Sequence, residues 1–343
     1  MLRLIDANLN RISEGLRLLE DVARFLLNDA ALSASLKSMR HELLSEHFSL
    51  QKELLSARDS ADDVAAFAEE EMRRADLPAI VTANARRVAE SLRVLEEFYK
   101  LPQSYTNLDL DPERFKKARF TLYELERALT GKILRCHKRI EGLYVIIDPE
   151  ALGGGDVGEV CRQAIRGGAK AIQLRDKKRS RAEVLAEAQK LKQVCTQYDV
   201  PFILNDYLDI ALASGADGLH LGQGDLPVSV ARRLLPIDNI LGCSTTTLKE
   251  ALQAEADGAD YIAVGAIYHT PSKAGAIVVG LERLRRIREA VSLPIVAIGG
   301  IDGKNAPEVV EAGADAIAVI GAILGAEDVE GAARRLRESM EVK

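Results

Sequence analysis

The sequence predicts an α/β protein in which a (β/α)8 TIM barrel over residues 141–343 follows an all-helical bundle over residues 1–138. The first part has few glycines and places Leu, Ala, Glu and Arg at helical spacing. After Gly142 the pattern changes to short Val-, Ile- and Leu-rich runs that alternate with amphipathic stretches, as in βα units of a parallel sheet. Eight such units in about 200 residues match the minimal size of a barrel. A doubly wound open sheet is the competing architecture.

Each of the eight predicted strands is a short apolar run with the length of one buried strand. The runs are Leu143–Ile147, Ala171–Leu174, Phe202–Leu204, Gly218–Leu221, Ile240–Gly242, Tyr261–Val264, Ile295–Ile298 and Ala316–Ile320. Helices are expected between or after them, among others at 181–197, 247–256, 281–291, 305–312 and 328–340. Glycines at 168, 215, 258 and 313 each stand between a helix and the next strand, where glycine permits the left-handed residue that ends a helix. These glycines favour the barrel and mark its N-terminal face, so we expect the chemistry in the loops that follow the strands.

The helical part contains an internal repeat. Residues 7–20 match residues 83–96 at an offset of 76 positions, so that Arg11 corresponds to Arg87. Two copies of one helical unit predict a pseudo-two-fold bundle, because a single unit could not bury its apolar stripe. The repeated polar residues share one broad helix face, and they are Asn8, Arg11, Glu14, Arg17, Asn84, Arg87, Glu90 and Arg93. They could line a site between the copies, but we favour ordinary intrahelical Arg–Glu pairing, worth a few tenths of a kcal/mol per pair.

Composition excludes several classes of protein. The net charge of −6 argues against broad nucleic-acid binding. No apolar run reaches the roughly 18 residues that a membrane span needs, and the N-terminus has no long apolar segment, so a cytoplasmic location is expected. The four cysteines are scattered without C-x-x-C spacing, which disfavours disulfides and zinc. Homo-oligomerisation is left open.

Polar residues follow the second, third and fourth predicted strands. Gln173-Leu174-Arg175-Asp176-Lys177 places an amide and two cations at the barrel mouth, and the guanidinium and ammonium groups suit phosphate oxygens. Asn205-Asp206 follows the third strand, and Asp225 comes shortly after the fourth. Mg²⁺ commonly takes one or two protein carboxylates and completes its shell with waters and substrate phosphates. The joint presence of these carboxylates and cations predicts a magnesium–diphosphate site with Asp206 and Asp225 as ligands, although Asn205 or Asp206 alone could simply cap a helix.

Three further assignments are less specific. His220 could pack in the core, orient a neighbouring loop or take part in chemistry. The fifth strand leads into Ser244-Thr245-Thr246, whose hydroxyls could donate to phosphate or cap the next helix. The sixth leads into a long loop over residues 265–280 that carries Thr270-Pro271-Ser272-Lys273. Because this loop is longer than a connection requires, it predicts a lid that brings Lys273 to the mouth.

A second anion site is expected after the last two strands. Gly299-Gly300 follows the seventh strand, and Ile320-Gly321 lies at the end of the eighth. Glycines there allow backbone N–H groups to approach a phosphate, at the place where barrels often hold one. A diphosphate site and a monophosphate site at one mouth predict a transfer between two phosphorylated small molecules.

Seven motifs in order, Q-L-R-D-K, L-N-D, H-L-G-Q-G-D, G-C-S-T, T-P-S-K, G-G-I and V-I-G-A-I, resemble those of the thiamine-phosphate synthases across essentially all of residues 141–343. The helical part resembles an N-terminal extension found on some of these synthases. The resemblance implies a transferase of thiamine biosynthesis that joins 4-amino-2-methyl-5-(diphosphooxymethyl)pyrimidine to a thiazole phosphate, or its carboxylate, and releases pyrophosphate. It also implies Mg²⁺ as cofactor.

The resemblance further implies a role for each matching residue. Gln173 would meet the pyrimidine, and Asp206 and Asp225 would bind Mg²⁺. The diphosphate would contact Arg175, Lys177, Asn205, Ser244 and Lys273. The thiazole phosphate would contact Thr270, Ser272, Gly300, Ile320 and Gly321. We expect Arg175, Lys177, Ser244 and Lys273 to assist the chemistry, and the substrate-binding set is completed by Leu174, Asp176, Pro271 and Gly299.

Two positions depart from the family pattern, because Thr246 stands where many relatives carry histidine and Gly321 where serine is common. One alternative is a thiazole tautomerase-like barrel, which would want a base near the fifth strand, where this chain offers Thr246. Another is a phosphosugar isomerase or epimerase, which would not require the carboxylates and cations together. A third is an idle barrel whose helical part serves as a binding or regulatory module.

Overall fold

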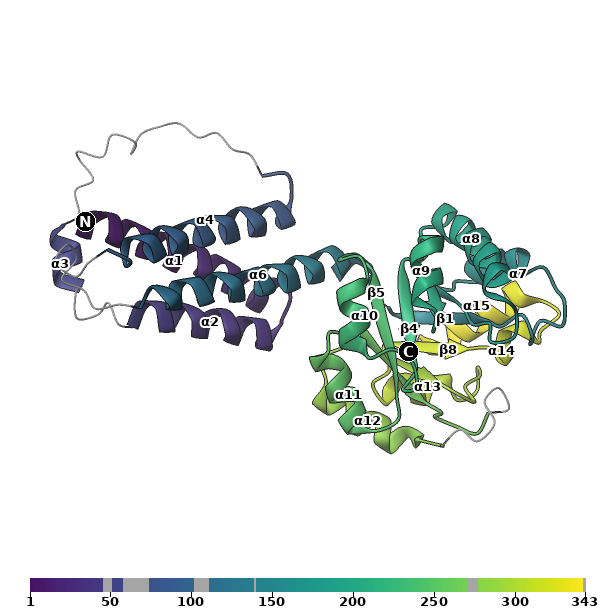
Figure 1. The fold of residues 1–343 in the computed structure, drawn as a ribbon. Helices are drawn as coiled ribbons and strands as arrows, with labels where there is room; N and C mark the ends of the chain where they lie inside the picture. The colour runs from purple at the N-terminus through teal and green to yellow at the C-terminus, as the bar shows by residue number, and fades with distance from the viewer. Residues whose placement is uncertain (46–50, 58–73, 102–110, 139, 271–276, 342–343) are drawn as a thin grey trace. The chain divides into compact units, whose positions relative to one another are not determined.

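The chain divides into two compact units, Met1–His137 and Lys138–Lys343. They were analysed in a computed structural model that describes residues 1–45, 51–57, 74–101, 111–138, 140–270 and 277–341. Figure 1 shows both units, each of which is considered by itself below. None of the described helices is long and apolar enough to cross a membrane.

The first unit is entirely helical in its described residues. Its elements are α1 (Leu2–Asp21), the π-helical turn η1 (Val22–Leu26), α2 (Ala30–Ser45), α3 (Gln51–Ser56), α4 (Leu77–Phe98), α6 (Pro112–Arg135) and the 3-10 turn η3 (Cys136–Lys138). The repeated helices α1 and α4 pack against each other, and a Cβ at Gly15 of α1 would lie only 2.4 Å from Cγ2 of Val88. The apolar stripes of the two copies therefore bury each other, as the repeat predicts.

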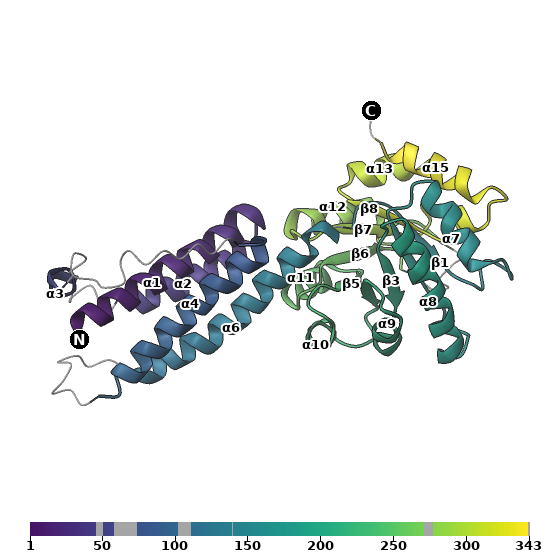
Figure 2. The same cartoon turned by 90° about the horizontal axis from the view of Figure 1, so that it is seen from above.

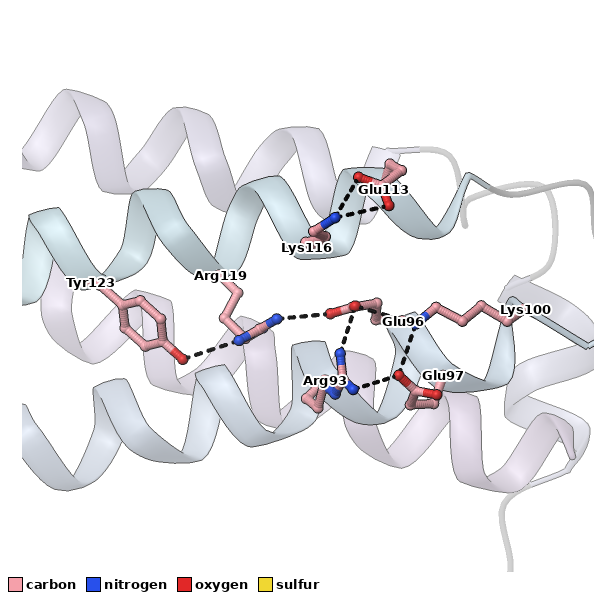
Figure 3. Close-up of polar contacts among 8 residues, drawn as sticks. All are labelled: Arg93, Glu96, Glu97, Lys100, Glu113, Lys116, Arg119 and Tyr123. Atoms are coloured by element: carbon pink, nitrogen blue, oxygen red, sulfur yellow. Dashed lines mark hydrogen bonds and ion pairs between the residues drawn. The ribbon is translucent and has the colours of Figure 1, made fainter.

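Each copy of the repeat holds one buried glutamate in an ion-pair cluster. Glu20 is 3% exposed and accepts from Arg40 of α2, with the nearer nitrogen at 2.9 Å. Figure 3 shows the equivalent Glu96 of α4, which accepts from Arg119 of α6 at 3.1 Å and from Arg93, one turn away on α4, at 2.7 Å. Arg17 lies 3.5 Å from Glu20 in the same relation. The duplicated polar residues thus include intrahelical Arg–Glu pairs, and each of these pairs is extended by an arginine from a neighbouring helix.

The other repeated polar residues contact the backbone of their own helix or are exposed, within the described part of this unit. Asn8 and Asn84 each donate to the backbone carbonyl four residues earlier, at 2.8 Å. Arg11, Glu14, Arg87 and Glu90 are exposed. The Asn8 and Asn84 contacts thus stay within one helix, as the intrahelical interpretation expects.

The second unit is a closed barrel of eight parallel strands in sequence order, as predicted. The strands are β1 (Gly142–Ile147), β2 (Ala171–Leu174), β3 (Phe202–Asn205), β4 (Gly218–Leu221), β5 (Ile240–Thr245), β6 (Tyr261–Gly265), β7 (Ile295–Ile298) and β8 (Ala316–Val319). The helices are α7 (Val157–Arg166), α8 (Arg181–Gln197), α9 (Leu208–Ser214), α10 (Val228–Leu234), α11 (Leu248–Ala256), α12 (Gly280–Ala290), α13 (Ala306–Glu311), α14 (Gly321–Leu324) and α15 (Val329–Met340). Figure 2 shows α7 to α13 and α15 around the strands.

Side chains alternate between two apolar layers along each strand. Val145, Leu174 and their equivalents pack outward against the helices. Tyr144, Tyr261 and their equivalents fill the barrel interior. This alternation follows from the two-residue period of a strand. It also turns the polar residues near the strand ends toward the interior, and these are Gln173, Asn205, His220 and Ser244.

Candidate active site

A partly buried ion pair joins the ends of β1 and β2. Arg175 follows β2, and its Nη1 lies 2.5 Å from Oδ2 of Asp148, the first residue after β1. The Arg175 backbone N–H also donates to Ile147 at 3.0 Å. Asp148 is 9% exposed, so the carboxylate holds the guanidinium at the mouth. Sequence reasoning missed Asp148, although its position directly after an apolar run was a signal of the kind used for the other strands.

Two carboxylates and a cation meet at the ends of β2, β3 and β4. Lys177 Nζ lies 3.1 Å from Oδ2 of Asp206, and the carboxyl groups of Asp206 and Asp225 are close enough to hydrogen-bond. Burial, and then the neighbouring Asp225 carboxylate, raise the pKa of Asp206, while Lys177 acts in the opposite direction. Asp225 also accepts from the backbone N–H of Gly222 at 2.7 Å.

The arrangement around Asp206 does not support helix capping. The N-cap of α9 is Tyr207, with no side-chain cap hydrogen bond. Asp206 instead has a positive φ of 66°, and its backbone N–H donates to the His220 carbonyl at 2.8 Å. A non-glycine residue in this left-handed region is uncommon and occurs often at functional sites. The backbone therefore presents the Asp206 carboxylate toward Lys177 and Asp225.

Two members of the Gln173–Lys177 segment turn away from the mouth. The Leu174 side chain packs in the outer core between strands and helices, so only its backbone is available to a substrate. Asp176 accepts from the backbone N–H groups of Lys178 and Arg179 at 3.1 Å and pairs with the Arg179 side chain. Burial alone would raise the pKa of Asp176, but the Arg179 contacts lower it overall. Asp176 thus holds the loop that carries Arg175 and Lys177.

Polar side chains also line the top of the barrel interior. His220 Nε2 lies 2.9 Å from the Ser244 hydroxyl, and its Nδ1 lies 2.9 Å from the Tyr261 hydroxyl. Burial lowers the pKa of His220 to about 4, although Asp225 acts in the opposite direction. Gln173, 3% exposed, donates from Nε2 to Tyr144 at 3.1 Å. His220 therefore bridges side chains rather than merely filling the core, and Ser244 contacts the histidine rather than capping a helix.

The residues after β7 and β8 form the other side of the mouth. Gly299 and Gly300 have φ of +100° and +68°, and a Cβ on Gly300 would lie 2.5 Å from the His269 carbonyl oxygen. The absence of a side chain at both positions thus allows their backbone to pack against the loop after β6. Ile320 is the N-cap of the short helix α14, which begins at Gly321. Loops after strands seven and eight with a short extra helix are a recurrent phosphate site in barrels.

Part of the expected site lies in the loop after β6. Thr270 is half-buried. Pro271, Ser272 and Lys273 lie outside the described residues, and so does the predicted closing contact of Lys273. The described ends of this loop are tied together, because the backbone N–H of Val279 donates to the Ala266 carbonyl at 2.7 Å.

Thr246 takes part in capping rather than in chemistry. Its backbone N–H and hydroxyl both donate to Oε2 of Glu250, at 2.7 and 2.9 Å. The same glutamate completes the capping box with Thr247 at the start of α11. This position therefore supplies no base, which counts against the tautomerase-like alternative.

Within the described ranges, no three His, Cys, Asp or Glu side chains gather closely enough to hold a metal ion. A cation at the mouth would therefore take at most two carboxylates from these residues. That donor set fits Mg²⁺ on a phosphorylated substrate, since this ion usually keeps several waters and binds substrate phosphates. Burial, and then the neighbouring Asp225 carboxylate, raise the pKa of Asp206, and a bound cation would favour the charged form of both carboxyl groups.

A closed parallel barrel with charged and polar groups at the C-terminal ends of its strands defines a (β/α)8-barrel enzyme. The family model described as thiamine monophosphate synthase matches residues 143–323. The chain is 41% identical to a thiamine-phosphate synthase of Thermosynechococcus vestitus over 97% of its length and 93% of that protein. It is also 41% identical to the Synechocystis thiamine-phosphate synthase, over 94% of its length and 91% of that protein. The chain belongs to the thiamine-phosphate synthase family and is a transferase of thiamine biosynthesis.

A solved structure and a second family model relate to different parts of the chain. The thiamine phosphate pyrophosphorylase from Pyrococcus furiosus is 44% identical, with a TM-score of 0.55, and the match covers 58% of this chain and 95% of that one. A model of the ThiD2 family matches residues 3–128, within the helical unit. The Thermosynechococcus and Synechocystis relatives match along nearly the whole chain, so the sequence similarity extends through the helical unit as well.

Proposed function

We propose that the barrel unit by itself condenses 4-amino-2-methyl-5-(diphosphooxymethyl)pyrimidine with a thiazole phosphate, or its carboxylate, at the mouth described above. The observation that carries this proposal is the grouping of Lys177, Asp206 and Asp225 at the same end of the barrel strands as the Arg175–Asp148 pair. Cations and carboxylates together suit a metal–diphosphate group. A phosphosugar isomerase would not require this combination.

The diphosphate is assigned to the side of the mouth formed by β2 to β5. Arg175 and Lys177 would contact its oxygens, with Asn205 and Ser244 as hydrogen-bonding groups. Asp206 and Asp225 would hold Mg²⁺, which when bound neutralises charge on the leaving pyrophosphate. Lys273 is assigned to the same diphosphate from the loop after β6. Gln173 would meet the pyrimidine, since commitment of Nε2 to Tyr144 leaves Oε1 to accept from the amino group.

The thiazole phosphate is assigned to the opposite side of the mouth. Backbone N–H groups at Gly300 and at Ile320-Gly321 would donate to its oxygens, and Thr270 and Ser272 would add hydroxyl groups. The start of α14 at Gly321 supports this assignment because N–H groups at the first turn of a helix have no intrahelical partner.

The proposed reaction needs no nucleophile from the protein. The C–O bond between the pyrimidine methylene and the diphosphate breaks as the aminopyrimidine donates electrons, and the electron pair leaves with pyrophosphate. The thiazole nitrogen then forms the new C–N bond, giving thiamine phosphate. With the carboxylate form of the thiazole, its C–CO2 bond also breaks, and CO2 leaves while a proton from water takes its place. Arg175 and Lys177 stabilise the charge that grows on the leaving group, and the mouth holds the two substrates in line. Positioning of the substrates and electrostatic stabilisation of the leaving group therefore account for the proposed rate acceleration.

Expression of residues 138–343 alone tests this assignment. The proposal expects thiamine phosphate and pyrophosphate in equal amounts from the two substrates and Mg²⁺, at a rate similar to that of the whole chain. Chelation with EDTA should stop the reaction, and added Mg²⁺ should restore it. A folded barrel unit that forms no product would contradict the proposal and favour a direct role of the helical unit in this reaction.

A further inference from the structure

Five side chains form one continuous chain of hydrogen bonds across the barrel interior. Gln173 Nε2 contacts the Tyr144 hydroxyl at 3.1 Å, and this hydroxyl lies 3.0 Å from that of Tyr261. Tyr261 then contacts His220 Nδ1 at 2.9 Å, and His220 Nε2 contacts the Ser244 hydroxyl at 2.9 Å. The residues come from five different strands, and the first four are at most 7% exposed. Only Ser244 is partly open to solvent.

The number of available protons fixes the direction of donation along this series of hydrogen bonds. An amide nitrogen donates and does not accept, so Gln173 donates to the oxygen of Tyr144. Each hydroxyl has one proton, so Tyr144 must donate to Tyr261, and Tyr261 must donate to Nδ1 of His220. If Tyr261 instead donated to Tyr144, the Tyr144 proton would have no acceptor among these five side chains. A buried polar group without a partner costs about 1–3 kcal/mol, which disfavours that arrangement.

The same count of protons assigns the tautomer of His220. Because Nδ1 accepts, a neutral His220 carries its proton on Nε2 and donates it to the oxygen of Ser244. The ring is expected to be neutral, since a protonated ring would also donate from Nδ1 and leave the Tyr261 proton without an acceptor among these five side chains. In a nucleophile-activating Ser–His pair, by contrast, the ring nitrogen accepts the serine proton. The polarity here is the reverse, so Ser244 keeps its proton.

We infer that this hydrogen-bond chain holds Ser244 as a donor toward an anionic oxygen in the mouth, and that His220 and Tyr261 are its positioning residues. The inference rests on the proposed function, because it takes the diphosphate as the source of that oxygen. Because one lone pair of the Ser244 oxygen accepts from His220, the Ser244 hydroxyl offers its proton to the substrate. The chain thereby favours a charged phosphoryl oxygen over a group that can only donate.

The barrel is built to leave room for the central link. Gly242 on β5 faces the Tyr261 ring, and a Cβ on this glycine would lie 2.1 Å from Cζ and 2.4 Å from the hydroxyl oxygen. The absence of a side chain on Gly242 is therefore what allows the tyrosine hydroxyl to reach both of its partners.

The first test measures the tautomer of His220 directly in the whole chain. In protein labelled with 15N-histidine, long-range 1H–15N correlation spectra distinguish a protonated ring nitrogen from an unprotonated one, and His220→Gln identifies the signals. The inference expects a neutral ring with its proton on Nε2 near pH 7, without substrate. A proton on Nδ1 would overturn the inference. It would leave the proposed function untouched, because that function is tested separately by product formation.

The second test asks whether Tyr261 acts through Ser244. The dissociation constant for inorganic pyrophosphate with Mg²⁺ is measured by calorimetry in wild type, Tyr261→Phe, Ser244→Ala and the double variant. Loss of one hydrogen-bond link corresponds to about a fivefold weaker affinity for Tyr261→Phe in the wild-type background. In the Ser244→Ala background the same change should alter the affinity by less than about twofold. Equal losses in both backgrounds would mean a merely structural role and would overturn the inference.

Two controls accompany these measurements. Tyr198→Phe removes a hydroxyl from a tyrosine that is 40% exposed, outside the barrel interior, and should change neither pyrophosphate affinity nor the His220 signals. If Tyr261→Phe does not fold, the tautomer of His220 in the wild-type chain still decides the question.

Discussion

Replacing Asp206 by asparagine separates the charge of this residue from its backbone conformation. The residue has a φ of 66°, in the left-handed region, where asparagine occurs readily and alanine does not. An alanine there would cost about 1–2 kcal/mol from the backbone alone. Asp206→Ala therefore tests two things at once, whereas Asp206→Asn keeps the shape and removes only the carboxylate that faces Lys177 at 3.1 Å.

The expected magnitudes follow from this environment. Removing one group that stabilises developing charge typically costs about 10²–10³ in kcat, and we expect kcat/KM of Asp206→Asn to fall by about this factor. Mutating a residue that only hydrogen-bonds to a metal ligand already weakens metal affinity by about 10–100-fold. Loss of a direct ligand should therefore raise the Mg²⁺ concentration for half-maximal activity by at least about tenfold.

The thermal stability of Asp206→Asn, unlike its activity, should not fall. Burial and the neighbouring Asp225 raise the pKa of Asp206 in the folded chain. A raised folded pKa means that the protonated form is favoured on folding, and that this stability is lost as the pH rises through the folded pKa. At neutral pH without metal, the neutral Asp206→Asn variant should therefore melt at or above the wild-type temperature, and Asp206→Ala below it.

The assay combines steady-state thiamine phosphate formation at varied Mg²⁺ with thermal unfolding of the three proteins. Added Mg²⁺ with pyrophosphate should raise the Tm of the wild type but not that of Asp206→Asn. Wild-type turnover and Mg²⁺ dependence in Asp206→Asn would refute the metal assignment. Equal Tm values for the Asn and Ala variants would refute the argument from backbone strain.

Three further predictions concern other parts of the chain. Gly321→Ser should lower KM for the thiazole phosphate about three- to tenfold, because a Cβ there meets nothing within 4 Å, whereas Gly321→Ala should leave KM unchanged in the same steady-state assay. Gly242→Ala should destabilise the barrel unit by about 1–3 kcal/mol in chemical denaturation, since its Cβ would overlap Tyr261; unchanged stability would contradict this packing. Glu96→Ala should destabilise the helical unit by about 3 kcal/mol, because Arg119 would lose its buried partner. Burial would raise the pKa of Glu96, but Arg119 and Arg93 lower it overall, so its contribution should be present at neutral pH and lost as the pH falls below about 4. Thermal unfolding of this variant and the wild type should then converge in acid.

Much of the fold could be predicted because its signals are local. The period of two residues in strands and 3.6 in helices is written in neighbouring positions, so the eight runs and the five helices named from the sequence appear with small shifts in their bounds. Where the bounds differ, contacts between strands decide. β5 continues to Thr245 because Ser244 and Thr245 pair with Ala263 and Val264 of β6.

The candidate site was only partly accessible from sequence. The order of strands placed Arg175, Lys177, Asp206 and Asp225 at one face of the barrel, since all parallel strands end there. It did not indicate that Asp176 and Leu174 turn away from the mouth, nor that Asp148 pairs with Arg175. The first outcome depends on the direction of each side chain in the folded barrel. The second depends on two residues that are 27 positions apart in the sequence.

The sequence by itself determined the alternation of strands and helices, the duplication in the helical unit and the chemical groups at the strand ends, because each follows from local periodicity or composition. Only the tertiary structure decided which of those groups meet. The link between Tyr144 and Tyr261 spans 117 residues, and it exists because the barrel closes in one register with Gly242 beneath the Tyr261 ring. Pairings of this kind depend on the global closure of the sheet, which no short segment of the chain encodes.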